Sequence, residues 1–546
     1  MSQHQAFRRV PVPQQVAQNL RTVTLPAPTR GIIESENEAY MQPGAALVCD
    51  NWVPTMRGVK LRGGYQPWCT LPEAVPIVSA FEYVSGGMQR MYAGTASKLY
   101  DVTSTVPALI KSGQSSGNYV AAQFANQGGD WLVVVNETGD APLRFNGSAW
   151  DVLDPTLPTP PENLITGPPD TPIENCKGLT CVWKYRNRLF FVEGGTMNAW
   201  YLGINSVGGA LQMIPLSGAA RMGGRLLFGA VVSMDAGDGM DDKVVFVTTE
   251  GEAIVFTGSN PADPANWRQE GRYYVGVPLG INAHFQVGGD LMILTVEGIV
   301  PLSAAIQKTG GALENAMLTR NIKSMWRGEV ADKREHPWTA KRWDDYGGIF
   351  VTTPGGKPGQ RRCLIANNAT GAWARLTNYD ALCFLHTYEN FFFGTHDGVI
   401  MQAERGGNDN GFPYHATVVG GWEMFQQPSA TVVWHQARAV FISNEAFIPH
   451  LSATVDFEVV IPTPPPVVAD VGILADVWDQ AKWDEGLWDQ ENPNKPPPRR
   501  NTMWVSIGAT GFTHAPIVQV TVAQQLRPNV ELVAVAATFE RLGVTV

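Results

Sequence analysis

KVVFVTTEGEAIVF, at residues 243–256, is the stretch that best indicates how this chain folds. Two runs rich in valine, isoleucine and phenylalanine flank a turn centred on Gly251, which is the pattern of an antiparallel β-hairpin. The same pattern occurs in six other stretches, at residues 91–102, 131–145, 188–202, 291–303, 347–367 and 391–402. The sequence therefore predicts an all-β fold.

The hairpins recur at a fairly constant spacing. Their turn glycines are Gly94, Gly139, Gly194, Gly251, Gly298, Gly355 and Gly398, and successive glycines lie 43 to 57 residues apart. Repeats of roughly 40 to 50 residues are typical of the four-stranded blades of β-propellers. We therefore predict a β-propeller-like domain over residues 75–405. No WD or kelch signature is present, so a pair of packed sheets or an irregular β array remains an alternative.

One segment of the predicted propeller has the pattern of a helix. Over residues 312–333, four apolar side chains fall roughly on one helical face. They are Leu313, Met317, Ile322 and Trp326. We expect a short helical insert there.

The two ends of the chain differ from its middle. Residues 1–74 contain eight prolines and no sustained helical or strand period, which predicts an extended N-terminal arm that lies on another surface. Residues 406–546 contain several strand-like runs and predict a C-terminal β domain. Within that domain, residues 462–500 form a Pro- and Trp-rich insert that we expect to protrude.

Composition excludes several classes of protein. The chain has 546 residues with 56 Gly and 39 Pro, which excludes a helical bundle. Its formal net charge of -10, from 40 basic and 50 acidic residues, argues against a protein that neutralises many phosphates. No run is long and apolar enough to predict a membrane span or a secretory signal. Six dispersed cysteines favour reduced, buried thiols.

Motifs that could support catalysis are weak. Gly113-Gln114-Ser115-Ser116-Gly117 matches G-x-S-x-G, but its flanks lack the strand and helix that a nucleophile elbow needs. The acidic group at 235–242 lacks the spacing of an EF-hand loop, and the histidines and cysteines lack the spacing of a zinc site. We therefore predict no enzyme, and no catalytic, metal or cofactor site.

The N-terminal segment carries a family resemblance. Residues 25–68 contain Gly31, Asn37, Met41-x-Pro43-Gly44-x-Ala46, Asn51-Trp52-x-Pro54, Arg57-Gly58-Val59 and Arg62-x-Gly64. This order of elements resembles the opening of tail nozzle, or tail hub, proteins of short-tailed bacteriophages. The central hairpins, the Ile-x-x-Met-Trp segment and the tryptophan-acid repeat at 478–489 are also similar to that group.

The resemblance implies a structural virion protein. Such a subunit would contain a β-propeller and would assemble in the host cytoplasm into a homohexameric ring in the tail. It would dock to the adaptor, with tail fibres as a further candidate partner. The ring would enclose the channel for DNA ejection without binding DNA tightly. A glycan-binding or glycan-cleaving propeller associated with the tail is the alternative. As interface residues we predict five tryptophans, namely Trp52, Trp68, Trp478, Trp483 and Trp488.

Overall fold

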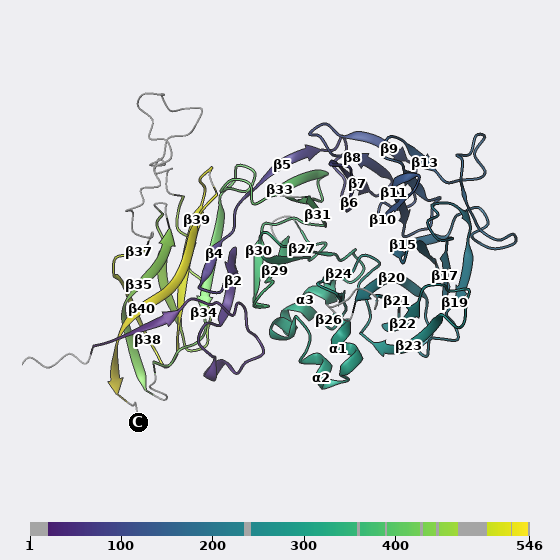
Figure 1. The fold of residues 1–546 in the computed structure, drawn as a ribbon. Coiled ribbons are helices and arrows are strands. Elements are labelled where there is room, and N and C mark those ends of the chain that lie inside the picture. Colours follow the sequence, from purple (N-terminus) through teal and green to yellow (C-terminus); the bar gives the residue numbers. More distant parts are fainter. Residues whose placement is uncertain are drawn as a thin grey trace, which may run out of the picture.

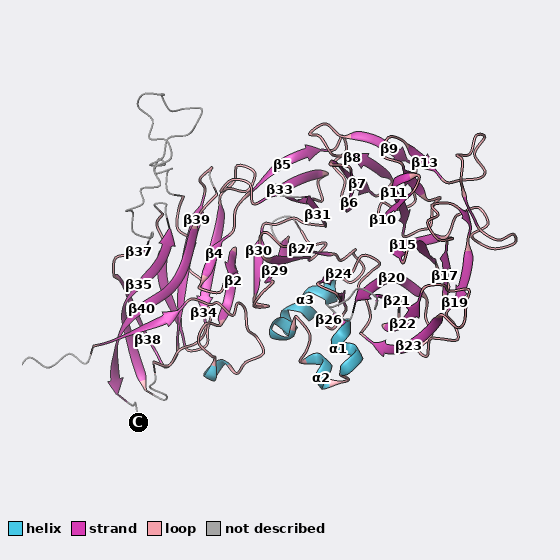
Figure 2. Cartoon of the chain, viewed as in Figure 1, coloured by secondary structure: helices cyan, strands magenta, loops and turns pink. Residues whose placement is uncertain are grey.

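The chain forms a ring of β-sheets joined to a two-sheet C-terminal domain (Figure 1). In this computed structural model, the described residues are 20–233, 242–357, 361–387, 390–425, 430–443, 447–467, 499–525 and 527–543. The ring is a β-propeller, so the predicted fold class is confirmed. Strands dominate the described residues, and the α-helices gather at one side of the ring (Figure 2).

Within the described ranges the ring contains seven sheets, which we call blades 1 to 7. From the innermost strand outward, blade 1 consists of β6 (Ile77–Ser85), β7 (Met88–Thr95), β8 (Lys98–Asp101) and β9 (Ala108–Ser112), and blade 2 consists of β10 (Tyr119–Asn126), β11 (Gly129–Asn136), β12 (Leu143–Phe145) and β13 (Trp150–Val152). Blade 3 consists of β15 (Leu179–Tyr185), β16 (Arg188–Glu193), β17 (Asn198–Tyr201) and β19 (Gln212–Pro215). Blade 4 consists of β20 (Leu226–Ser233), β21 (Asp242–Thr248), β22 (Glu252–Gly258) and β23 (Trp267–Tyr274). A short parallel pair, β14 (Ile165–Thr166) with β18 (Gly209–Ala210), lies in the connections around blade 3.

Blades 5 to 7 complete the ring. Blade 5 consists of β24 (His284–Val287), β25 (Asp290–Leu294) and β26 (Ile299–Pro301). Blade 6 consists of β27 (Ala340–Trp343), β28 (Gly348–Thr352), β29 (Arg362–Asn367) and β30 (Trp373–Thr377). Blade 7 consists of β31 (Cys383–Thr387), β32 (Asn390–Gly394), β33 (Val399–Ala403) and β5 (Tyr65–Thr70). Because β5 comes from the N-terminal segment, strands from both ends of the propeller sequence close blade 7. The innermost strand of blade 7 lies beside that of blade 1, so the ring is closed.

Trp68 sits at this closure. Its indole Nε1 donates a 3.0 Å hydrogen bond to the carbonyl of Val102, which follows the third strand of blade 1. Its ring packs edge-on against Phe392 of blade 7, with 5.5 Å between ring centroids. Trp68 therefore joins the last blade to the first within one chain.

The helical insert consists of short pieces rather than one helix. They are α1 (Leu302–Gln307), α2 (Gly311–Glu314), the 3-10 turn η2 (Arg320–Ile322) and α3 (Lys323–Lys333). Thr319 lies in the non-helical stretch between α2 and η2. Its hydroxyl accepts a 3.0 Å hydrogen bond from the backbone amide of Ile299 and so connects this stretch to blade 5. As expected from the pattern, Leu313, Ile322 and Trp326 are buried.

The C-terminal domain consists of two sheets. The first contains β3 (Trp52–Pro54), β4 (Val59–Leu61), β40 (Val530–Gly543), β35 (Thr431–Ser443), β37 (Arg499–Asn501), β1 (Arg21–Pro26) and β38 (Val505–Gly511). The second contains β2 (Ala46–Asp50), β34 (Tyr414–Gly420), β39 (His514–Val522) and β36 (His450–Val455), and it continues into blade 6. Buried and half-buried side chains alternate along most of β35, as expected for a strand with one face on a core.

A single sheet runs from the propeller into the C-terminal domain. Strand β2 lies parallel to β30 of blade 6, with Asp50 opposite Arg375. The Arg375 guanidinium donates to both oxygens of the Asp50 carboxylate, at 2.6 and 3.0 Å, and the Asn51 amide donates to the Arg375 carbonyl at 2.8 Å. This two-bond pairing holds β2 in register with β30 and so joins the two domains.

The N-terminal segment differs from the arm that its sequence predicts. Its described part forms five strands, β1 to β5, together with the 3-10 turn η1 (Glu38–Tyr40). The prolines are compatible with pairing because of where they lie: Pro26 and Pro54 end their strands, and Pro67 occupies an outermost strand where the register shifts. The regular structure arises from pairing with distant strands, which a local period cannot reveal.

Candidate functional site

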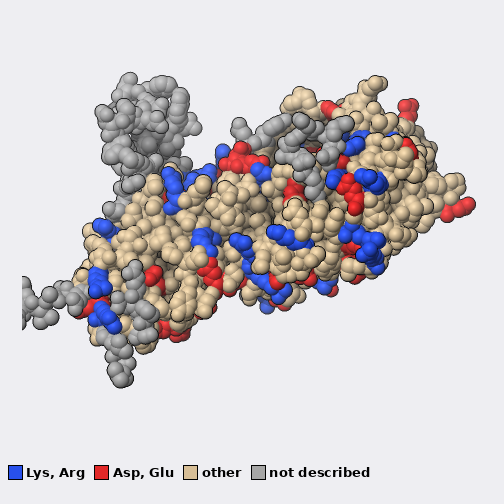
Figure 3. Space-filling view, turned by 60° about the horizontal axis from the view of Figure 1, so that its bottom comes forward, with Lys and Arg blue, Asp and Glu red and all other residues tan. Residues whose placement is uncertain are grey.

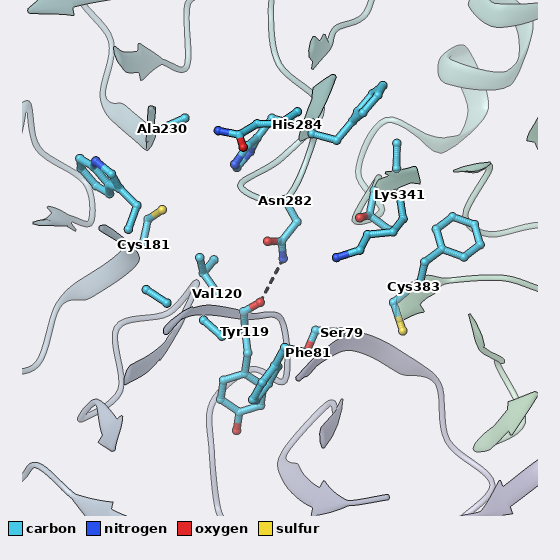
Figure 4. A pocket seen from close by; sticks show the side chains of 18 of the residues that line it. Ser79, Phe81, Tyr119, Val120, Cys181, Ala230, Asn282, His284, Lys341 and Cys383 are labelled. Carbon is cyan, nitrogen blue, oxygen red and sulfur yellow. Dashed lines mark hydrogen bonds between the residues drawn. The ribbon is translucent and has the colours of Figure 1, made fainter. Parts of the chain in front are cut away.

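A cavity lies at the centre of the propeller. It has a volume of about 850 Å³ and is lined by the innermost strands of all seven blades. A close view shows side chains from different blades facing one another across it (Figure 4). This volume falls within the range of about 300 to 1,000 Å³ typical of small-molecule sites.

One side chain spans the channel at the cavity. Asn282 precedes the innermost strand of blade 5, and its Nδ2 donates to Asn118 Oδ1 at 2.8 Å and to the Tyr119 carbonyl at 3.2 Å, both at the start of blade 2 (Figure 4). Blades 2 and 5 are not neighbours in the ring. The bond therefore crosses the channel rather than a seam between adjacent blades.

Amide side chains also join neighbouring blades along their inner edges. The Gln123 side chain of blade 2 accepts from the Val84 amide at 3.1 Å and donates to the Val84 carbonyl in blade 1. Gln286 of blade 5 donates to the Val231 carbonyl of blade 4 at 2.9 Å. The innermost strand of each blade has one edge whose backbone groups are not paired with another strand. These side-chain amides form hydrogen bonds with some of those groups.

The cavity wall between blades 3 and 4 is tightly packed. Gly229 lies against the Trp183 ring, and a Cβ added at Gly229 would be 2.2 Å from Trp183 Cζ2. The Trp183 ring is itself held by Phe190, stacked with 5.6 Å between centroids, and by Phe246 at 5.8 Å. Glycine is thus the residue that lets the indole reach the cavity wall.

This packing makes a stability prediction. We expect Gly229→Ala to lower the free energy of unfolding by about 1–3 kcal/mol, because the held indole must shift to admit the methyl group. Chemical denaturation followed by circular dichroism measures the change. Gly218→Ala is the matched control, since its added Cβ would meet nothing within 4 Å, and we expect a change within about 0.5 kcal/mol. Equal stability of Gly229→Ala and the parent protein would contradict the argument.

Cations outnumber carboxylates in the cavity lining. Among the described lining residues, the charged side chains are Lys184, Lys341, Arg342 and Asp344, and Arg342 pairs with Asp344. Lys341, from blade 6, extends its ammonium toward the middle of the channel (Figure 4). Burial lowers the pKa of His284 to about 4, so the imidazole, stacked on Phe228 with 4.3 Å between centroids, is neutral at pH 7.

Two thiols in the lining are unreactive. Burial raises the pKa of Cys181 and of Cys383 to about 12. All six cysteines are buried and free of disulfides, as the sequence predicts. The thiolates that act as nucleophiles or metal ligands are therefore scarce at neutral pH.

A second buried polar cluster lies where the N-terminal segment meets both domains. Arg62 is fully buried and donates to both carboxylate oxygens of Asp409 at 2.7 Å each, and its Nε donates to Asn51 Oδ1 at 2.9 Å. Its guanidinium also stacks over the Tyr414 ring, 3.9 Å from the centroid. Burial alone would lower the pKa of Arg62, but the Asp409 carboxylate raises it above its ordinary value.

The predicted interface tryptophans are not brought together by the structure. Trp52 is fully buried in the C-terminal domain, where its ring stacks on Phe441 at 6.5 Å, and Trp68 joins blades 7 and 1. Their partners lie within the same chain. Trp478, Trp483 and Trp488 lie outside the described residues.

The described residues include only part of the weak motifs. Ser115 lies in an exposed turn, where its hydroxyl donates to Asp140 at 2.9 Å, and only Asp242 of the acidic group lies within the described residues. Among these residues no group of three or more His, Cys, Asp and Glu side chains could hold a metal ion. No helix in the described ranges combines the length and apolar character needed to cross a membrane.

Comparisons with known proteins provide similarity of shape alone. No family model and no curated protein matches the chain. A structure of YCF48 bound to a D1 peptide matches with 12% identity and a TM-score of 0.33, covering 63% of this chain and 97% of that one. The β-propeller domain of Cps50 (Swd1) from Myceliophteria thermophila matches with 10% identity and a TM-score of 0.38, covering 62% and 99%. Sqt1 from Saccharomyces cerevisiae matches with 11% identity and a TM-score of 0.32, covering 66% and 86%.

Proposed function

We propose that this chain is a structural subunit of the virion tail of a short-tailed bacteriophage, in which copies form a ring that encloses the DNA ejection channel and docks to the adaptor. The sequence resemblance of residues 25–68 to tail nozzle proteins is the origin of the proposal. A hexameric ring is the arrangement which that resemblance implies. Three features of the described residues support a role in assembly.

The first feature is rigidity between the two domains. Blade 6 and one C-terminal sheet form a single eight-stranded sheet, and the N-terminal segment contributes strands to both domains. A ring closes only when each subunit turns its neighbour by the right angle. A body without a hinge between its domains can hold that angle.

The feature that carries the proposal is an exposed apolar surface on the C-terminal domain, which we call the apolar patch. It consists of Phe457, Val459, Val460, Ile461 and Phe512, each at least 41% exposed. Asp456 brings its two segments together, because its Oδ1 accepts a 2.7 Å hydrogen bond from the Phe512 amide. Exposed apolar side chains that gather on one part of a surface are typical of sites of protein association.

The third feature concerns the path of DNA. The Asn282 bridge crosses the channel of the propeller, so a duplex would pass between subunits of a ring rather than through one propeller. On the face drawn in Figure 3, small groups of basic and acidic side chains are interspersed across a largely uncharged surface. Mixed charge of this kind suits a wall that guides DNA without the many phosphate contacts that give tight binding.

Electron microscopy and sedimentation of the purified protein test the proposal. We expect closed rings, and we expect Val460→Glu to weaken self-association at least tenfold, because it buries a charge in the contact. Val106→Glu, at a side chain of blade 1 that is 74% exposed, is the control and should assemble normally. A protein that stays monomeric, or Val460→Glu rings as stable as those of the parent, would contradict the assembly model. Hydrolysis of bacterial polysaccharide would instead favour the glycan-cleaving alternative.

A further inference from the structure

We propose that the central cavity of the propeller is a binding site for a small organic anion that carries carboxylate or phosphate groups. The proposal goes beyond the structural role above and does not depend on ring formation. It rests on the charges that line the cavity, on their lack of partners and on the shape of the walls.

The charge of the cavity is opposite to that of the whole chain. The chain has a net charge of -10, whereas Asp344, the one carboxylate among the described residues of the lining, is paired with Arg342. The remaining charged side chains of the lining are Lys184 and Lys341. They come from blades 3 and 6, which are not neighbours in the ring; Lys184 is exposed and Lys341 is half-buried.

Neither lysine has an anionic partner among the residues that the structure describes. Among the described residues, no ion pair or hydrogen bond engages the ammonium of Lys341, which extends toward the middle of the channel (Figure 4). Lys184 lies over the Phe124 ring, with its Nζ 5.7 Å from the centroid, and has no carboxylate partner there. An ammonium in a partly enclosed cavity interacts with an anion more strongly than one in open water does, because the surrounding dielectric is lower.

The walls between the lysines suit an organic ligand rather than a bare ion. Val182, Trp183, Ala230 and Phe384 contribute apolar surface to the lining. Small-molecule sites combine such surface with a few fixed polar groups. Asn282 supplies one fixed polar group, because its hydrogen bonds to blade 2 hold it in place across the channel.

Isothermal titration calorimetry of the full chain tests the proposal. Citrate is the probe for carboxylates and pyrophosphate is the probe for phosphates, so the two arms separate the two sources of negative charge. We expect at least one probe to bind once per chain, and we expect Lys341→Met to raise its Kd at least tenfold. Lys341→Arg should retain most of the affinity, because it keeps the charge.

Two further variants make the outcome decisive. Lys184→Met should weaken binding in the same direction as Lys341→Met, whereas Lys308→Met, at an exposed lysine after helix α1, should have no effect. Equal circular dichroism spectra establish that the variants are folded. The proposal is overturned if neither probe binds at millimolar concentration, or if Lys341→Met and Lys308→Met bind a probe with the same affinity.

Discussion

Arg62→Met is expected to lower the free energy of unfolding by about 3–5 kcal/mol, because it leaves the buried Asp409 carboxylate without its cation. Arg62 is fully buried and makes two 2.7 Å contacts with Asp409. Methionine fills part of the volume but donates no hydrogen bond. Urea denaturation, followed by the fluorescence of the many buried tryptophans, measures the change.

The loss should extend beyond one ion pair. The Arg62 guanidinium also donates to Asn51 and to the carbonyls of Gly63 and Thr377. These groups belong to the N-terminal segment and to blade 6, while Asp409 precedes the C-terminal strand β34. Removing the guanidinium therefore unpairs the Asp409 carboxylate and takes a hydrogen bond from the carbonyls of Gly63 and Thr377, whereas Asn51 Oδ1 keeps the Thr377 amide as a donor at 2.9 Å. A buried group left without any partner costs about 1–3 kcal/mol.

Arg57→Met is the matched control, because Arg57 lies in the same hairpin. Its side chain is 72% exposed, and Glu531, the buried carboxylate with which it pairs at 2.7 Å, keeps a hydrogen bond from the Thr55 hydroxyl, so we expect a clearly smaller loss than for Arg62→Met. Similar losses for Arg57→Met and Arg62→Met would show that the buried cluster does not have the energetic weight assigned to it.

The propeller could be predicted from the sequence because its blades are built from local hairpins. Strands β21 and β22 are separated by a turn at Gly251, and the alternation of strands and turn is visible in residues 243–256. Strand β5 gave no such signal. It pairs with β33, more than 300 residues away, and nothing in residues 65–70 alone indicates that partner.

The cavity could not be predicted for a related reason. Lys341 and Asn282 stand alone in the sequence, without a motif, and only the closed ring brings them to a common space. The sequence did single out two of the buried tryptophans, because Trp52 and Trp68 are among the residues that it predicts at an interface. What it could not show is that their partners, Phe441 and Phe392, belong to the same chain.

The N-terminal segment has a large role in the fold, because it supplies strands to three separate sheets. Strand β5 forms the outer edge of blade 7, β2 joins blade 6 to the C-terminal domain, and β1, β3 and β4 belong to the first C-terminal sheet. Without them, the buried edges of β33, β34 and β40 would lose their partners. Exposed strand edges of this kind promote aggregation.

A chain that begins at residue 75 is therefore expected to be insoluble when expressed alone, with loss of most native circular dichroism signal. Supplying residues 20–74 as a separate polypeptide in the same cell should restore part of the soluble material, because those strands can pair in trans. As a control, an unrelated polypeptide of equal length should restore none. The opposite result, a soluble and cooperatively folded 75–546 fragment, would mean that the segment is a dispensable arm resting on a complete fold, as its proline-rich sequence first indicates.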